Sequence, residues 1–187
     1  MIHTKNKKKS LEVTVEEMRN FSVTYIEKYA PSKQQLKTYL LKKYLQSKLH
    51  NINKKNVTDL IDVVLQDLEK SKFVNDSFYS NSKAKSLLNR GSSINKIRNY
   101  LLSKGIDNKY ILETINQIKD NNEDQDFFSA IKICKKKKIG PSRAEDNRNL
   151  FYKKDIAILA RSGFDFETSK KVMDLNKDEY LKIINLL

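Results

Sequence analysis

With 187 residues, the chain has the length of one or two ordinary domains. Hydrophobic residues make up 39% and charged residues 32%, a balance that favours a thin, largely solvated structure over one thick core. Only four glycines and two prolines occur, which is too few for the many turns of a strand-rich fold. The composition therefore predicts an all-α protein.

The charge is strongly unbalanced, with 37 lysine and arginine residues against 23 acidic residues and a net charge of +14. An excess of this size favours contact with polyanions or with acidic protein surfaces. An AT-rich genome would also raise the lysine content without any selection for binding. A compositional origin of the charge therefore stays open beside a functional one.

The chemistry and the cellular compartment of the protein are limited by its cysteine and histidine content and by the length of its apolar runs. A single cysteine, Cys134, cannot form an internal disulfide, which predicts a reducing compartment. The two histidines, His3 and His50, have no metal-site spacing. No apolar run reaches the roughly 18 residues of a membrane span, and none follows the basic start as in a secretory signal. We expect a cytoplasmic protein that has no membrane-spanning segment and binds no metal or cofactor.

In chain order, residues 1–12 are expected to be a disordered basic tail. Thr14 and Glu17 have the spacing of a capping box and predict the start of the first helix. Apolar residues then recur at spacings of three and four: Met18, Phe21, Tyr25 and Tyr29. Pro31 ends this helix, because the residue before a proline resists helical geometry.

Two further helices complete the first group. Ser32 is expected to cap the second helix, which carries an apolar stripe of Leu36, Leu40 and Tyr44. A polar loop is predicted over residues 50–56. The third helix, over residues 58–68, has the cleanest amphipathic pattern in the chain.

The same succession then recurs twice. In the second round a helix over 78–88 is followed by one capped by Ser92 or Ser93 and ended by Gly105, and by a third capped by Asp107. In the third round a helix over 126–138 breaks at Gly140-Pro141, a second covers 149–161, and a third continues from Phe166 through Met173. A last helix is expected over 178–187.

Matching positions indicate internal repeats. The segment Leu102-Ser103-Lys104-Gly105-Ile106 corresponds to Ala160-Arg161-Ser162-Gly163-Phe164. We therefore predict three-helix repeats over 13–74, 75–122 and 123–176, followed by a short C-terminal helix over 177–187. Because one such unit buries little surface, the repeats are expected to stack into an elongated, curved helical array of right or left hand.

The main candidate contact surface is in the second repeat. Six basic residues fall within 22 residues that contain no acid: Lys83, Lys85, Arg90, Lys96, Arg98 and Lys104. Lys96 lies away from the apolar stripe of its helix and is expected to face solvent. Contacts of such groups with phosphates or carboxylates would be electrostatic and salt-sensitive. The alternative is an ordinary solvated helix face.

The third repeat adds Arg161 and the densest cationic run of the chain: Lys135, Lys136, Lys137 and Lys138. Four consecutive residues point around the whole helix, so either one lysine conflicts with packing or the helix frays there. A helix C-terminus favours cations by under ~1 kcal/mol, and this explanation stands beside DNA contact. The lysines of the N-terminal tail, Lys5 to Lys9, are a further candidate as a flexible arm.

The tyrosines and the lack of enzyme motifs in the sequence also constrain the function. Tyr25, Tyr29, Tyr44 and Tyr110 have core spacing and are expected to pack rather than to stack on bases, whereas the role of Tyr39, Tyr79, Tyr100 and Tyr152 stays open. The sequence has no Gly-rich phosphate loop, no nucleophile elbow and no histidine paired with carboxylates. The protein is therefore not expected to be an enzyme.

Three stretches carry motifs in a fixed order. The first repeat has Tyr29-Ala30-Pro31-Ser32 with Gln35-Leu36, the second has Val74 to Phe78, Arg90-Gly91 and Lys104-Gly105-Ile106, and the third has Leu159 to Phe164. Their order and spacing resemble those of the RecX family over about residues 14–175. The third stretch is similar to the family's closing Leu-x-Arg-Arg-Gly-Phe.

The resemblance implies a regulator that binds RecA in the groove of the RecA–DNA filament. Such a protein would inhibit strand exchange, ATP hydrolysis and coprotease activity in DNA repair and the SOS response, without catalytic residues or a cofactor. We expect a monomer that also binds single- and double-stranded DNA weakly and without sequence specificity. Two alternatives are a stand-alone basic nucleic-acid-binding helical module and an α-solenoid scaffold for an acidic partner.

Overall fold

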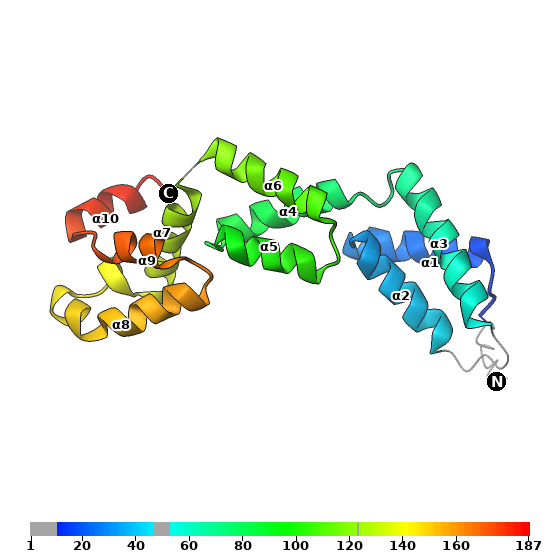
Figure 1. The fold of residues 1–187 in the computed structure, drawn as a ribbon, viewed down its shortest axis with the longest axis horizontal. Coiled ribbons are helices and arrows are strands. Elements are labelled where there is room, and N and C mark those ends of the chain that lie inside the picture. The colour runs from blue at the N-terminus through cyan, green and yellow to red at the C-terminus, as the bar shows by residue number, and fades with distance from the viewer. Residues whose placement is uncertain (1–10, 47–52, 123) are drawn as a thin grey trace, which may run out of the picture. The chain divides into compact units, whose positions relative to one another are not determined.

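The computed structural model describes residues 11–46, 53–122 and 124–187, and in these segments the chain forms helices and no strands (Figure 1). This confirms the predicted all-α fold. The chain divides into two compact units, Met1–Asn75 and Asp76–Leu187. The lysines of the tail and part of the predicted 50–56 loop lie outside the described residues. The tandem, curved arrangement of the repeats stays a prediction.

The N-terminal unit contains α1 (Val15–Tyr29), α2 (Lys33–Leu45) and α3 (Lys54–Lys70). All three helices share one core, since their apolar stripes face one another. Its buried residues are Met18, Leu36, Leu40, Tyr44, Val57, Ile61, Val64, Leu65, Leu68 and Val74. Leu11, within the predicted tail, also packs against this core.

Side-chain caps fix the starts of these helices, with one departure from expectation. Thr14 Oγ1 accepts the Glu17 amide as predicted, but Glu17 Oε2 accepts the amide of Glu12 and does not close a capping box. The full box forms instead at Ser32 and Gln35, which bond each other's backbone amides. Of the capping box predicted at α1, the Thr14 side-chain hydrogen bond forms and the reciprocal Glu17 one does not.

Two expectations for this unit were wrong in detail. Tyr29 was expected in the core, but its side chain is 54% exposed because α1 ends at this residue. Tyr25 does pack, with its ring stacked on Tyr39 at 4.1 Å between centroids. The third helix begins at Lys54, four residues before the predicted Thr58, because Asn53 accepts backbone amides there and caps it.

The C-terminal unit begins with α4 (Asp76–Asn89), α5 (Ile94–Ser103) and α6 (Asn108–Asn121). Ser93 and Asp107 cap α5 and α6 through their side chains, as the sequence predicts. The buried residues of their core are Tyr79, Ala84, Ile97, Leu101, Ile106, Ile111, Ile115 and Ile118.

The remainder of this unit contains α7 (Gln125–Lys137), the 3-10 turn η1 (Gly140–Ser142), α8 (Glu145–Arg161), α9 (Phe166–Met173) and α10 (Lys177–Ile184). A second buried cluster joins them: Ala130, Ile131, Cys134, Ile139, Leu159, Phe164, Val172, Met173 and Tyr180. Phe166 was expected to continue the buried pattern but is 68% exposed, since it is the first residue of α9 and follows the cap. No helix in the described segments is long and apolar enough to cross a bilayer.

The ends of α5 and α8 have the same local structure. Gly105 and Gly163 both adopt positive φ, at 70° and 92°. After each, the amide of a buried residue bonds back to a carbonyl five residues earlier, Ile106 to Leu101 and Phe164 to Leu159. Glycine is suited to this left-handed position because it has no Cβ. The matching sequence segments therefore fold alike.

Inside the C-terminal unit, Gly163 presses against the start of α5. A Cβ at this position would overlap Ser93 Oγ and lie 3.4 Å from Lys96 Cβ. Ser93 Oγ accepts the Lys96 amide and donates to the Ser162 carbonyl at 3.1 Å. The Asp126 carboxylate on α7 accepts the Ile94 amide at 2.8 Å. The N-terminus of α5 is thus held by both α8 and α7.

Replacing Gly163 with alanine is expected to destabilise this unit by about 2–4 kcal/mol, because backbone strain adds to the overlap with Ser93. Urea unfolding followed by circular dichroism measures the change. Gly105→Ala is the matched control, since Gly105 has a similar φ but is exposed. Equal losses for the two variants would contradict the contact with α5 as the cause.

A buried ion pair fixes η1 against α8. The Asp155 side chain is fully buried and accepts hydrogen bonds from the Gly140 amide at 2.8 Å and from Arg143 Nε and Nη2 at 2.6 and 2.9 Å. Burial alone would raise the pKa of Asp155, but these hydrogen bonds outweigh it and hold the pKa below its ordinary value. The carboxylate is therefore charged at neutral pH.

Candidate functional site

The predicted basic residues reach the surface to different extents. Eight of them are exposed: Lys85, Arg90, Lys96, Lys135, Lys136, Lys137, Lys138 and Arg161. Lys83, Arg98 and Lys104 are half-buried. The expected exposure of Lys96 is confirmed.

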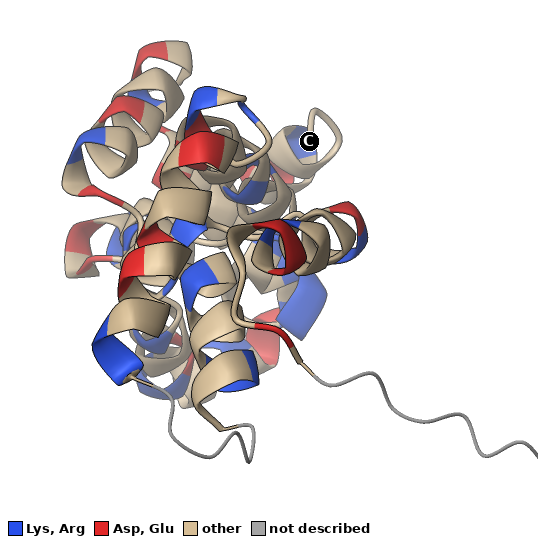
Figure 2. Cartoon of the chain, turned by 90° about the vertical axis from the view of Figure 1, so that its right-hand side faces the viewer, with Lys and Arg blue, Asp and Glu red and all other residues tan. Residues whose placement is uncertain are grey.

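Charge totals do not favour either unit. Residues 1–75 contain 15 cations and 8 acids, and residues 76–187 contain 22 and 15, so each part carries +7. Figure 2 shows basic and acidic positions alternating along the same helices. A candidate interface must therefore be identified from local groupings rather than from total charge.

Two of the candidates are held on a pair of tyrosines between α4 and α5. Lys83 Nζ lies 5.5 Å from the Tyr79 ring centroid, and Lys104 Nζ lies 5.3 Å from that of Tyr100. The two hydroxyl oxygens are 3.5 Å apart. Burial and this hydrogen bond raise the pKa of Tyr79 above its ordinary value, so the phenol stays neutral. Such cation–π contacts contribute about 0.5–1 kcal/mol each at exposed sites.

A second grouping forms where the ends of α4 and α8 meet other helices. Gly163 lies against Lys96, so Arg161, the last residue of α8, is two residues from this contact with the start of α5. Gly91, with φ +80°, lies against α7, and a Cβ there would be 3.1 Å from Lys132 Cβ. Arg90 therefore adjoins Lys132. We call Arg90, Lys96, Lys132 and Arg161 the junction cluster.

Lys132 was missed in the sequence analysis. It precedes Lys135 and Lys136 by three and four residues, so the same helix face carries all three, and this spacing was visible in the sequence. Its proximity to Arg90 was not, because that depends on how the end of α4 packs on α7.

The lysine run at the end of α7 avoids the predicted conflict with packing. The buried face of α7 runs through Ile131 and Cys134, and its next position would be Lys138. The helix ends there instead: Lys138 adopts φ 54°, and the Ile139 amide bonds to the Cys134 carbonyl at 3.1 Å. All four lysines consequently remain exposed.

The remaining candidates are not part of either grouping. Lys85 lines a pocket between α4 and α6, where the Thr114 hydroxyl donates to Asn81 Oδ1 at 2.9 Å. Arg98 is half-buried on α5. Neither residue takes part in the contacts of Gly91 and Gly163.

Ion pairs involve three cations of the N-terminal unit. There, Arg19, Lys33 and Lys37 each pair with an acid at 2.6 Å. With Lys104 left aside, none of the predicted basic residues forms an ion pair with a carboxylate that the structure describes. Their charges are accordingly not neutralised within the described segments.

No group of three His, Cys, Asp or Glu side chains in the described segments is placed to hold a metal ion. The exposed cations are a charged feature that a ligand can reach. Their chemistry suits phosphate or carboxylate oxygens, which accept charge-assisted hydrogen bonds.

Comparison with known proteins places the chain in a family. No protein-family model and no solved structure matches it. The Regulatory protein RecX of Myxococcus xanthus (strain DK1622) is 30% identical over 176 residues, which cover 90% of each chain. An alignment of this extent includes most of the described helices. The chain belongs to the RecX family.

Proposed function

We propose that this protein binds RecA filaments on DNA and lowers their recombinase, ATPase and coprotease activities. Membership of the RecX family supports this regulatory, non-enzymatic role, since the relative is itself named a regulatory protein. In this role the protein acts in the cytoplasm as a monomer, during DNA repair and the SOS response.

The observation that carries the proposal is the junction cluster. Arg90, Lys96 and Arg161 are exposed and form no ion pair with a described carboxylate. The contact of Gly163 with Lys96 supports a position of Arg161 near the start of α5, and the contact of Gly91 with Lys132 supports one of Arg90 near α7. Cations held in fixed positions attract an acidic protein surface or a phosphate backbone and speed association. With DNA alone the same groups would bind weakly and without sequence preference, because phosphate contacts carry no base information.

Titrating the protein into a RecA ATPase assay on single-stranded DNA tests the proposal. We expect inhibition at a substoichiometric ratio to RecA, because one bound molecule within a filament affects many protomers. The control repeats the titration with DNA in excess. Inhibition that disappears under excess DNA would point to a stand-alone nucleic-acid-binding module. If RecA activity does not change, the remaining alternative is a scaffold for an acidic partner.

A further inference from the structure

A pocket in the C-terminal unit combines clustered positive charge with an apolar wall. It has a volume of about 420 Å³ and is lined by Asn89, Lys132, Lys135, Lys136, Ile184 and Leu187. Three helices supply it: the end of α4, the face of α7, and α10 with the residues after it. A volume of this size is typical of pockets that hold small molecules.

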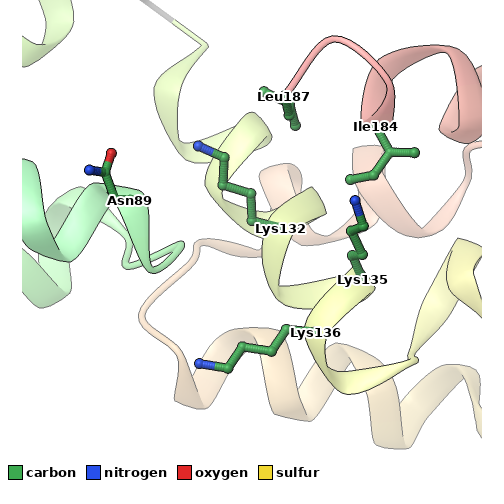
Figure 3. A pocket seen from close by; sticks show the side chains of 6 residues that line it. All are labelled: Asn89, Lys132, Lys135, Lys136, Ile184 and Leu187. Carbon is green, nitrogen blue, oxygen red and sulfur yellow. The ribbon is translucent and has the colours of Figure 1, made fainter.

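The lysines extend into different parts of this pocket. Figure 3 shows Lys132 and Lys136 extending from α7 toward the side where Asn89 lies, while Lys135 extends toward Ile184. Residues four apart on a helix lie one above the other, so Lys132 and Lys136 present two ammonium groups on one side. The pocket therefore offers separate positive groups to adjacent anionic groups of one ligand.

The walls are fixed by packing. A Cβ at Gly91 would lie only 3.0 Å from the Ser129 carbonyl oxygen. The end of α4 therefore packs closely on α7 beside Lys132. On the other side, Tyr180 of α10 is buried in the same cluster as Cys134 of α7, and Ile184 packs against that cluster. The pocket is therefore part of the fold of this unit.

We propose that this pocket binds a nucleoside triphosphate. Its adjacent phosphates match three lysines grouped on one helix face, whereas a polynucleotide carries one charge per nucleotide and needs a continuous groove. Asn89 supplies amide and carbonyl groups suited to a base edge or a sugar hydroxyl. Ile184 and Leu187 supply the apolar surface on which the nucleoside lies. This ligand goes beyond the proposed RecA-directed function; Lys132 belongs to both the junction cluster and this pocket, but the test of the pocket does not use RecA.

Isothermal titration calorimetry on the full chain, without RecA, tests the assignment. ATP, inorganic tripolyphosphate and a deoxythymidine oligonucleotide are titrated separately at constant ionic strength. We expect ATP and tripolyphosphate to bind, and the variant K132Q/K135Q/K136Q to weaken both about tenfold or more, because charge-assisted hydrogen bonds are lost. The control K137Q/K138Q/K153Q removes the same charge from exposed positions outside the pocket lining and is expected to bind as the parent does.

A second variant tests the apolar wall. Leu187→Ser is expected to weaken ATP binding several-fold and to leave tripolyphosphate binding unchanged, because only the nucleoside contacts this side chain. Circular dichroism verifies that each variant keeps its helicity. The assignment is overturned if ATP does not bind, if both triple variants weaken it equally, or if only the oligonucleotide responds to the pocket substitutions. Failure of the RecA titration would not affect these results.

Discussion

Replacing Asp155 with asparagine is expected to lower the free energy of unfolding of the C-terminal unit by about 2–4 kcal/mol. Removing one partner of a buried ion pair typically costs about 3–5 kcal/mol, since the other charge is left without compensation. The cost here falls toward the lower end because the Arg143 side chain is 23% exposed and can recover some hydration. Thermal unfolding should show a fall in Tm of roughly 10 °C.

Asp124→Asn is the matched control in the same unit. Its pair with Lys171 spans 3.4 Å, and both side chains are more than half exposed. Exposed pairs contribute about 0–1 kcal/mol, so this variant should unfold close to the parent temperature. Similar losses for Asp124→Asn and Asp155→Asn would contradict a special role of the buried pair.

The effect of Asp155→Asn should depend on pH with a defined sign. The pKa of Asp155 is lower in the folded protein than its ordinary value of about 3.9. Its contribution is therefore complete above that ordinary value and is lost as pH falls through the folded pKa. The stability difference between parent and variant should be constant near neutrality and shrink below about pH 4. A difference that grows on acidification would reverse the assigned direction.

Reversing the charge of two residues of the junction cluster, K96E/R161E, is expected to raise the protein concentration needed for half-inhibition of RecA about tenfold or more. Two favourable contacts become repulsive, and charge complementarity governs both the association rate and the affinity of such interfaces. Lys96 and Arg161 are both exposed, so the fold should tolerate the change. The ATPase titration described above gives the measurement.

The control K153E/K182E makes the same change in net charge at exposed lysines on α8 and α10. It is expected to inhibit nearly as well as the parent, because it lies outside the junction cluster. Helicity of both variants is compared by circular dichroism. Full inhibition by K96E/R161E would remove the junction cluster from the interface.

Much of the local structure was predictable from sequence. Asp107 and Ser93 cap helices, and Gly105 and Gly163 end them. Each of these features depends on a side chain and on backbone groups within a few residues of it. Some helix starts were misplaced by the sequence pattern: α8 begins at Glu145, four residues before the expected Asn149. Apolar periodicity does not mark the polar first turn of a helix, where Glu145 and Asp146 lie.

Two sites depended on contacts between distant segments. Asp155 stands four residues before Leu159, so helical spacing places it on the buried face of α8, but the contact with Arg143 that compensates its charge lies outside this helix. Lys96 and Arg161 belong to separate predicted repeats, and the packing of Gly163 on the start of α5 brings the segments that carry them into contact. Such pairings depend on which helix ends come into contact. The residues next to each partner in the chain do not specify this.

The amino-acid sequence by itself determined the helical class, most helix ends and the motifs of the RecX family, because hydrogen-bonded caps and apolar periodicity are local properties. The tertiary structure alone decided which helix ends meet, that Gly91 lies against Lys132, and that Tyr29 and Phe166 remain exposed. The physical reason is that burial and charge proximity follow from the fit of whole helix faces. At Gly91 and Gly163, that fit requires the absence of a Cβ.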